Sequence, residues 1–326
     1  MAPQWSDIAR MPRPQPREPV TVFRGTAGIN NKADPARLKF DPQTGIADLA
    51  EGVNVDVDDT GRPKRRLGYA LTAETGSMHS IFCDGGLCLG VSGSSLYWIG
   101  NDYSKTLIRS NLTLNARMGY VQVGDNIYYG NGYEKGIVLS TGVHRDWTAA
   151  TYSGPTTIKT MSDPPIGYLF ALMGGWIYIA HQDEAGNYLM WFTEPFAYSW
   201  VDYARDAYWW ESRITMMRPI ADGMYASDSK ATYFLAGRDP KKLERIKVAD
   251  YPAVMGTDLN VPGHRVAGGQ LLQGEIAIWT SHQGICIGGV GGQFFNLTDE
   301  KLALPEAVEG SAIFTDDGRY IVTFEP

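Results

Sequence analysis

The sequence predicts an all-β fold, a β-propeller-like domain of about six or seven blades, and its composition and internal repetition support this prediction. The chain has 326 residues, of which 37 are glycine and 12% are aromatic. Glycine permits tight turns and aromatic residues favour strands, so this composition indicates many short strands rather than long helices. Propellers of this length can form one domain, and we expect residues 21–326 to do so.

Six segments with the pattern of a β-hairpin recur along the chain, each with apolar residues on both sides of a short polar or glycine-rich turn. They occupy residues 94–108, 124–140, 174–193, 222–237, 274–289 and 310–324. Comparable points in successive segments lie roughly 31 to 53 residues apart, which scatters around the 40–50 residues of a four-stranded blade. We therefore expect one blade around each hairpin, with the strands before residue 80 adding to the count.

The chain is expected to close its own ring and to contain few helices. The last segment ends on an alternating strand, and in propellers the last strand often pairs with the first blade and removes the open edges. The segment "DPKKLERIKVADY" is the best helix candidate, with Asp239 as N-cap and Pro240 in the first turn. Its apolar residues Leu243 and Ile246 would share one side, over one or two turns at most.

Residues 1–20 are expected to form an extended N-terminal arm, because their prolines fix the backbone and remove hydrogen-bond donors. Such an arm is either an unstructured tail or a strap on a neighbouring subunit. Trp5, Ile8 and Met11 would be its anchors in the second case. The segment lacks the apolar stretch of a signal peptide, and no segment has the roughly 20 apolar residues of a membrane helix.

Charge and cysteine content narrow the function classes. The net charge of −7 argues against broad electrostatic binding of nucleic acid, which needs lysine and arginine against the phosphates. Three cysteines form no disulfide framework and suit synthesis in a reducing cytosol. Cys83 and Cys88 have only His79 near them in sequence, which is too few ligands for a zinc site.

The stretch "EGVNVDVDDTGRPKRRLGY" (51–69) predicts a hairpin with a charged return strand. Val53, Val55 and Val57 would face one side of a half-buried strand. The start "DVDDTG" resembles a calcium loop, but Leu67 stands where the bidentate glutamate would be needed, so a turn at 58–61 is simpler. Four basic residues follow, either as a solvated strand or as a contact with an acidic neighbour or phosphate backbone: Arg62, Lys64, Arg65 and Arg66.

No catalytic, cofactor or metal site stands out. The glycines of 288–293 do not fit a dinucleotide fingerprint, because Phe294 stands where the third glycine belongs. The five histidines are scattered, and no nucleophile elbow is present. Glu194 lies among aromatic residues as in a sugar-binding site, but a strand and turn whose aromatic residues pack between blades explain the same pattern. We therefore predict no enzyme activity and no cofactor.

Several segments together resemble the tail nozzle proteins of short-tailed bacteriophages, formerly called packaged-DNA stabilisation proteins. The resemblance lies in "GTAGINNKADPARL" (25–38), in 45–69, where the family typically has "NVDVDDTGR-RRRPG", and in 191–200, 214–237 and 278–298. It covers most of the chain after residue 20 and is most distinctive at 54–68. Leu67 replaces the family's usual proline, and nozzle proteins are often longer. The chain could therefore be a nozzle, an adaptor ring or a related tail hub.

The resemblance implies a propeller-like fold and a homo-oligomeric ring, six copies in the nozzles, around a channel through which DNA passes without sequence-specific binding. It implies contacts with portal, adaptor and other tail proteins, a place in the virion tail after synthesis in the host cytoplasm, and no catalysis. It also favours a subunit-interface role for the arm and for the basic hairpin. The alternatives are a carbohydrate-binding or glycan-degrading propeller that acts on the host surface, and a host-type soluble propeller scaffold.

Overall fold

The chain is described by a computed structural model that covers residues 24–58, 60–68, 77–84, 86–149, 161–266 and 274–325. It divides into two compact units, one comprising Met1–Tyr69 with Glu300–Leu302 and the other Ala70–Asp299 with Ala303–Pro326. The sequence had suggested one domain from residue 21 to 326. The structure instead separates the residues up to Tyr69 from the propeller. The predicted arm at 1–20, with Trp5, Ile8 and Met11, lies outside the described residues.

The smaller unit contains two small sheets and one 3-10 turn, η2 (Pro35–Arg37). Strands β1 (Gly25–Ile29), β3 (Ile46–Leu49) and β2 (Phe40–Asp41) form one sheet, and β4 (Val55–Val57) with β5 (Pro63–Arg65) forms a hairpin. The buried Asp48 carboxylate accepts hydrogen bonds from Asn30 Nδ2 at 3.1 Å and Lys301 Nζ at 3.0 Å. Burial alone would raise the pKa of Asp48, but these donors outweigh it and lower that pKa.

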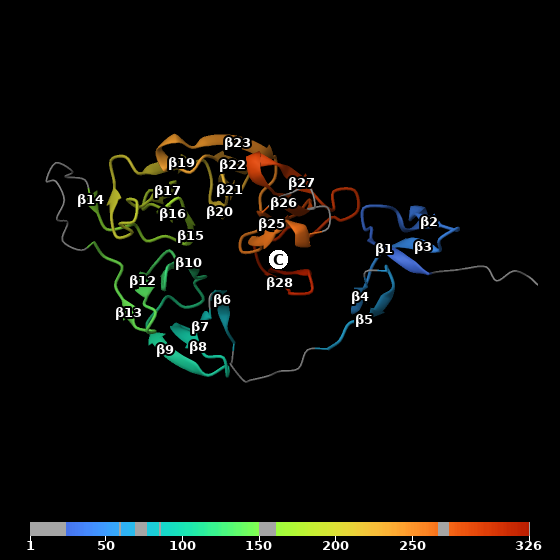
Figure 1. Ribbon diagram of the computed structural model, residues 1–326, viewed down its shortest axis with the longest axis horizontal. Coiled ribbons are helices and arrows are strands. Elements are labelled where there is room, and N and C mark those ends of the chain that lie inside the picture. The colour runs from blue at the N-terminus through green and yellow to red at the C-terminus, as the bar shows by residue number, and fades with distance from the viewer. Residues whose placement is uncertain are drawn as a thin grey trace, which may run out of the picture. The chain divides into compact units, whose positions relative to one another are not determined.

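The larger unit is a β-propeller-like ring of antiparallel sheets (Figure 1). Five sheets have four strands each in the described part of the chain. They are β6 (His79–Asp84), β7 (Leu87–Ser92), β8 (Ser95–Ile99) and β9 (Lys105–Arg109); β10 (Gly119–Val123), β11 (Asn126–Gly130), β12 (Lys135–Val138) and β13 (His144–Arg145); β15 (Leu169–Met173), β16 (Trp176–Gln182), β17 (Tyr188–Phe192) and β19 (Ala207–Trp210); β20 (Ile214–Ile220), β21 (Gly223–Asp228), β22 (Thr232–Ala236) and β23 (Glu244–Ala249); and β24 (Leu259–Pro262), β25 (Glu275–Ser281), β26 (Gly284–Gly288) and β27 (Phe294–Asn296).

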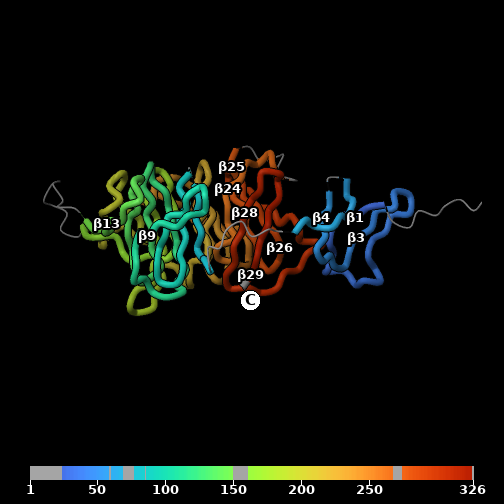
Figure 2. Tube along the Cα trace, turned by 90° about the horizontal axis from the view of Figure 1, so that it is seen from below, coloured from blue at the N-terminus to red at the C-terminus, as the bar shows by residue number. Residues whose placement is uncertain are grey.

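The sixth sheet has two strands, β28 (Glu309–Phe314) and β29 (Tyr320–Glu325). A small accessory pair joins β14 (Met161–Ser162) to β18 (Val201–Asp202), and short 3-10 turns lie at η3 (Pro240–Lys242), η4 (Gly263–Arg265) and η6 (Val290–Gly292). Figure 2 shows the same ring from the side. The all-β, propeller-like prediction is thus confirmed, with six propeller sheets in the described residues.

All six predicted hairpins are present, at β8–β9, β11–β12, β16–β17, β21–β22, β25–β26 and β28–β29. The helix candidate is right only at its start. Asp239 caps the 3-10 turn by accepting a hydrogen bond from Lys241 N at 3.0 Å. The chain then continues as β23, so Ile246 belongs to a strand, because pairing with β22 satisfies more backbone groups than another helical turn.

The hydrophobic core consists of five clusters, and each fills the space between two successive sheets. They lie between the first and second sheets, the second and third, the third and fourth, the fourth and fifth, and the fifth and sixth. For example, the rings of Trp279 and Tyr225, both fully buried, pack against each other with centroids 5.4 Å apart between the fourth and fifth sheets. No such cluster lies between the sixth sheet and the first among the described residues.

The predicted closure of the ring by its last strand is wrong. In the described residues β29 pairs only with β28, and the first sheet has the order β6-β7-β8-β9 without it. The last sheet is held to the fifth instead, where Gly310 N donates to Met255 O at 2.9 Å and Tyr320 Oη donates to Thr257 O at 2.6 Å. The alternating pattern predicted the strand correctly, but it contains no information about the partner of the strand's second edge.

Candidate functional site at the centre and the open interface

The inner strands of the propeller surround a central cavity of about 820 Å³. All six sheets contribute to its lining, through β6, the start of β10, β15, β20, the segment before and at the start of β24, and β28. A cavity of this size matches a small-molecule site, not a passage for a DNA duplex. The charged groups that line it and the adjoining cleft nearly balance: Asp84, Asp258 and Glu309 against Arg117 and Arg218.

An ion pair between Arg218 and Asp258 joins the fourth sheet to the start of the fifth. Arg218 Nε and Nη2 donate to Asp258 Oδ2 at 2.8 and 2.6 Å, and Nη2 also donates to the Asp258 carbonyl at 2.7 Å. The aspartate side chain is 3% exposed and the arginine 32%. A carboxylate this deeply buried needs its partner, so the pair locks two sheets together at the cavity wall.

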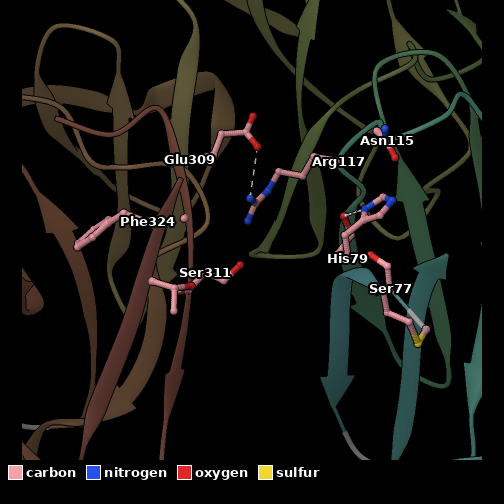
Figure 3. A pocket seen from close by; sticks show the side chains of 11 residues that line it. Ser77, His79, Asn115, Arg117, Glu309, Ser311 and Phe324 are labelled. Atoms are coloured by element: carbon pink, nitrogen blue, oxygen red, sulfur yellow. Dashed lines mark hydrogen bonds and ion pairs between the residues drawn. The ribbon is translucent and has the colours of Figure 1, made fainter. Parts of the chain in front are cut away.

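A second, looser ion pair spans the interface between the first and last sheets (Figure 3). Arg117, which precedes β10, approaches Glu309 at 3.5 Å, and both side chains are about 30% exposed. Its guanidinium lies directly against Gly256, where φ is +80° and any Cβ would collide with it. The cleft around this pair has a volume of about 520 Å³ and is also lined by Ser77, His79 and Thr323.

His79 faces this cleft from the side opposite Glu309 (Figure 3). Burial and the positive charge of Arg117 lower the pKa of its imidazole. Its Nδ1 lies 3.0 Å from Ser80 Oγ, which also accepts a hydrogen bond from Met118 N at 2.9 Å. No ion pair to a carboxylate is found for His79 in the described chain.

The basic residues predicted to form a subunit interface lie on the β4–β5 hairpin of the smaller unit. Arg62, Lys64, Arg65 and Arg66 are all exposed. Arg66 Nε pairs with Asp56 at 3.1 Å, as a cross-strand acid–base contact. The predicted half-buried valine face is wrong, because Val53 is 68% and Val57 46% exposed and Asn54 has a φ of 55° that delays the strand.

The stretch that resembles a calcium loop is a turn, as predicted. Asp58 Oδ1 accepts hydrogen bonds from Thr60 N, Thr60 Oγ1 and Arg62 N at 2.6 to 3.0 Å. The Thr60 hydroxyl and the Arg62 amide lower the pKa of the Asp58 carboxyl. No cluster of three or more metal-binding side chains occurs in the part of the chain that the structure describes.

The cysteine prediction needs correction, since the structure joins Cys83 and Cys88 in a disulfide. The two residues are directly opposite each other across β6 and β7. The number of cysteines alone did not predict this pair. The signal was the turn sequence "DGG" between them, which sets the register that places the two sulfur atoms together. Cys286 remains a free, buried thiol whose pKa burial raises to about 11.

The aromatic segment around Glu194 mostly packs between sheets, as the simpler explanation predicted. Trp191 is 7% and Phe192 2% exposed, in the clusters on the two sides of the third sheet. Burial and the charge of Asp206 raise the pKa of Glu194. Trp209, which belongs to the aromatic segment from Trp191 to Trp210, is 66% exposed and lines an outer pocket of about 410 Å³ with Trp191 and Tyr203.

The glycines of 288–293 have a packing role. The Tyr225 ring lies over Gly288, where an added Cβ would come within 2.4 Å of it. Tyr225 Oη lies 2.8 Å from Gly289 O and 2.7 Å from Gln293 O, within hydrogen-bonding distance of both. The cluster therefore seals the fourth sheet against the fifth. The charged residues of the central cavity and the adjoining cleft gave no sequence signal, because they are isolated in different segments. They include Arg117, Arg218 and Glu309.

Comparison with known proteins gives structural neighbours alone. No family model matches the chain, and no curated protein matches it. Solved structures similar to it include the WD40 domain of Neurospora crassa Pan2 (13% identity, TM-score 0.41, 70% of this chain and 67% of that one) and a catalytically inactive virginiamycin B lyase from Staphylococcus aureus with quinupristin (10%, 0.44, 77% and 85%). Another is the N-terminal domain of Nup159 (8%, 0.43, 76% and 72%).

The described residues contain no helix that is long and apolar enough to cross a membrane.

Proposed function

We propose that this protein is a structural ring component of a bacteriophage tail, of the nozzle or adaptor type, that borders the path of the exiting DNA. The observation that carries the proposal is the exposed basic hairpin at 54–68, where the resemblance to nozzle proteins is most distinctive. Exposed basic side chains on a hairpin outside the propeller suit contact with an acidic neighbour. The proposal assigns the chain no catalysis and a place in the virion tail.

In this proposal the DNA path lies in the middle of a ring of copies and not inside one propeller. The central cavity of one copy has the size of a small-molecule site. A ring of copies with a net charge of −7 each repels phosphate and lets DNA slide without tight binding. Portal, adaptor and other tail proteins are the expected neighbours above and below, and six copies is the expected number.

The oligomeric state in solution and the position in the virion test this function. Negative-stain imaging and mass photometry of the purified chain should show closed rings with a mass several times 35.9 kDa. Immunogold labelling of phage particles from the source culture should mark one end of the tail. Only monomers at every concentration, together with unlabelled tails, would overturn the proposal.

A glycan-binding propeller is the second candidate, and the outer pocket of the third sheet favours it. The rings of Trp191 and Tyr203 contact each other in a tilted arrangement, with centroids 4.6 Å apart, beside the exposed Trp209, and His181 and Asp183 add polar groups to the same pocket. Exposed aromatic faces with nearby polar groups are suited to sugar rings. A glycan array with wild type and Trp209→Ala would support this candidate only if binding is detected and the substitution abolishes it.

A further inference from the structure

The sixth sheet lacks two strands that the other five sheets have. In the described residues it consists of β28 and β29 alone, whereas each other sheet continues to a fourth strand. Outer strands in this molecule can be very short, since β13 spans two residues and β27 three. A short hairpin of two strands would therefore complete the sixth sheet to the size of the rest.

The outer edge of β29 presents backbone groups that can accept such a hairpin. Thr315 N donates to Arg319 O at 2.9 Å, so hydrogen-bonded pairs alternate along the sheet from that point. Tyr320, Val322 and Phe324 therefore direct their N–H and C=O groups away from β28. An unpaired strand edge of six residues is a template for pairing with another strand.

The face of the first sheet that looks toward the sixth is left partly uncovered. Ile81 and Leu107 are 60% and 56% exposed there, and Ile313 of β28 is 58% exposed. Gly90 marks the same face, because a Cβ on it would meet Ile81 and Ile99. At the five other interfaces the equivalent apolar side chains are buried in the core clusters.

The β4–β5 hairpin has the features of the missing pair. It consists of two antiparallel strands in a sheet of their own, and isolated two-stranded hairpins are marginally stable. Pro63 and Lys64 make β5 a natural outermost strand, because proline and lysine protect exposed edges. On β4, Val55 and Val57 direct their backbone groups away from β5, since Asp58 N and Arg66 N donate across the hairpin.

The return strand of the hairpin is basic, and the last sheet is acidic. Residues 54–68 contain three acidic residues on and after β4 and four basic residues at 62–66, and residues 303–324 contain four acidic residues and one basic one. Opposite charges of this kind steer two surfaces together and fix their register. The apolar Val57, 46% exposed, would gain neighbours on the open sheet.

We propose that the β4–β5 hairpin of a second copy of this chain completes the sixth sheet, with β4 added antiparallel to β29. The inference rests on the proposed ring function and names the two surfaces that meet. Because each copy carries one hairpin and one open edge, the contact is head-to-tail and repeats from copy to copy until the ring closes. Pairing also buries the exposed apolar face of the first sheet.

Cross-linking between differently tagged copies tests this contact. One chain carries Val57→Cys and the other Val322→Cys, and the mixture is treated with a short bifunctional thiol reagent that tolerates a register shift of one residue pair. The native cysteines do not compete, since Cys83 and Cys88 are paired and Cys286 is buried. We expect a cross-linked heterodimer, with the joined peptides identified by mass spectrometry.

The control replaces Val57→Cys with Leu114→Cys, which is 66% exposed but lies in the loop between the first two sheets. It should give no link to Val322→Cys. A link that forms only within a chain carrying both substitutions, and never between singly substituted chains, would mean that each hairpin occupies its own sheet and would overturn the exchange between copies.

A proline on the outer edge of β29 tests the proposed contact independently of ring formation. Val322→Pro removes an outward N–H without removing a bond to β28, and Val322→Ala shortens the same side chain but keeps the donor. We expect rings from Val322→Ala and monomers from Val322→Pro, with the same circular dichroism. Rings that persist in Val322→Pro, together with no cross-link between the Val57→Cys and Val322→Cys chains, would overturn the docking and leave the ring function standing. A wild-type chain that never forms rings would instead remove the proposed function.

Discussion

Five interfaces of this propeller are sealed, and the sixth is open. Between the fourth and fifth sheets Trp279 and Tyr225 are fully buried and the glycine cluster closes around them. Between the last sheet and the first, the described residues form no such core cluster, and the ion pair of Arg117 with Glu309 at 3.5 Å lies beside a cleft of about 520 Å³. The fold's stability is therefore concentrated in the sealed interfaces, and the open one is available for assembly.

The largest expected difference in stability is between the same substitution at a sealed interface and at an exposed surface. Trp279→Ala should lower the free energy of unfolding by about 3–5 kcal/mol, because it leaves a cavity against Tyr225 and Phe294. Trp209→Ala, at a side chain that is 66% exposed, should change it by about 0.5 kcal/mol or less. Urea unfolding followed by circular dichroism measures both. Equal losses would mean that the two surfaces do not differ as described.

The ion pair at the central cavity should contribute more to stability than the ion pair at the open interface. Arg218→Met leaves the buried Asp258 carboxylate without a partner and should cost about 2–4 kcal/mol, somewhat below a fully buried pair because the guanidinium is partly exposed. Arg117→Met breaks the pair at the open interface, where both groups are about 30% exposed, and should cost about 1 kcal/mol or less. The same unfolding assay compares them, and a larger loss in Arg117→Met would contradict the comparison.

The pH dependence of stability should report on His79 at the open interface. Its pKa is lowered in the folded chain, so the unfolded chain binds the proton more readily. The contribution of the neutral imidazole is therefore complete above the unfolded pKa and is lost as the pH falls through that value toward the folded pKa. His79→Gln should lose less stability than wild type between pH 7.5 and 5.5. The exposed His264→Gln should follow wild type in thermal unfolding.

The smallest expected effect on the chain itself is at the basic hairpin. Arg66→Ala removes one exposed cross-strand pair with Asp56 and should change stability by a few tenths of a kcal/mol. The salt concentration at which rings dissociate should change more than the stability of the chain, because salt screens the attraction between charges at the contact. Rings should dissociate at lower salt in Arg66→Ala than in wild type, as mass photometry over a salt series would show. Unchanged salt sensitivity would remove this arginine from the interface.

The sequence predicted the hairpins well, because each depends on neighbouring residues. Apolar alternation and turn chemistry around Gly186 and Asn187 specify a local register, and the same logic applies to the other five. It failed where the outcome depends on distant partners. Cys83 and Cys88 were counted rather than placed in their register, and the last strand was assigned a partner that the structure does not give it.

The candidate site was less predictable than the fold for the same reason. Arg62 to Arg66 stood out as a local basic run, and the structure places them on an exposed hairpin. Arg117, Arg218 and Asp258 stood out in no segment, since they come together only when the inner strands surround one cavity. A pattern of single charges on separate strands contains no information about which of them will be neighbours.

The sequence by itself determined the strands, their turns and the two oppositely charged segments, because side-chain period and turn geometry act over a few residues. The tertiary structure alone decided how many strands each sheet contains, which interfaces are filled, and that β29 pairs with β28 alone in the described residues. Those features depend on contacts between residues far apart in the chain, where packing and hydrogen-bond satisfaction choose among partners that local patterns leave equivalent.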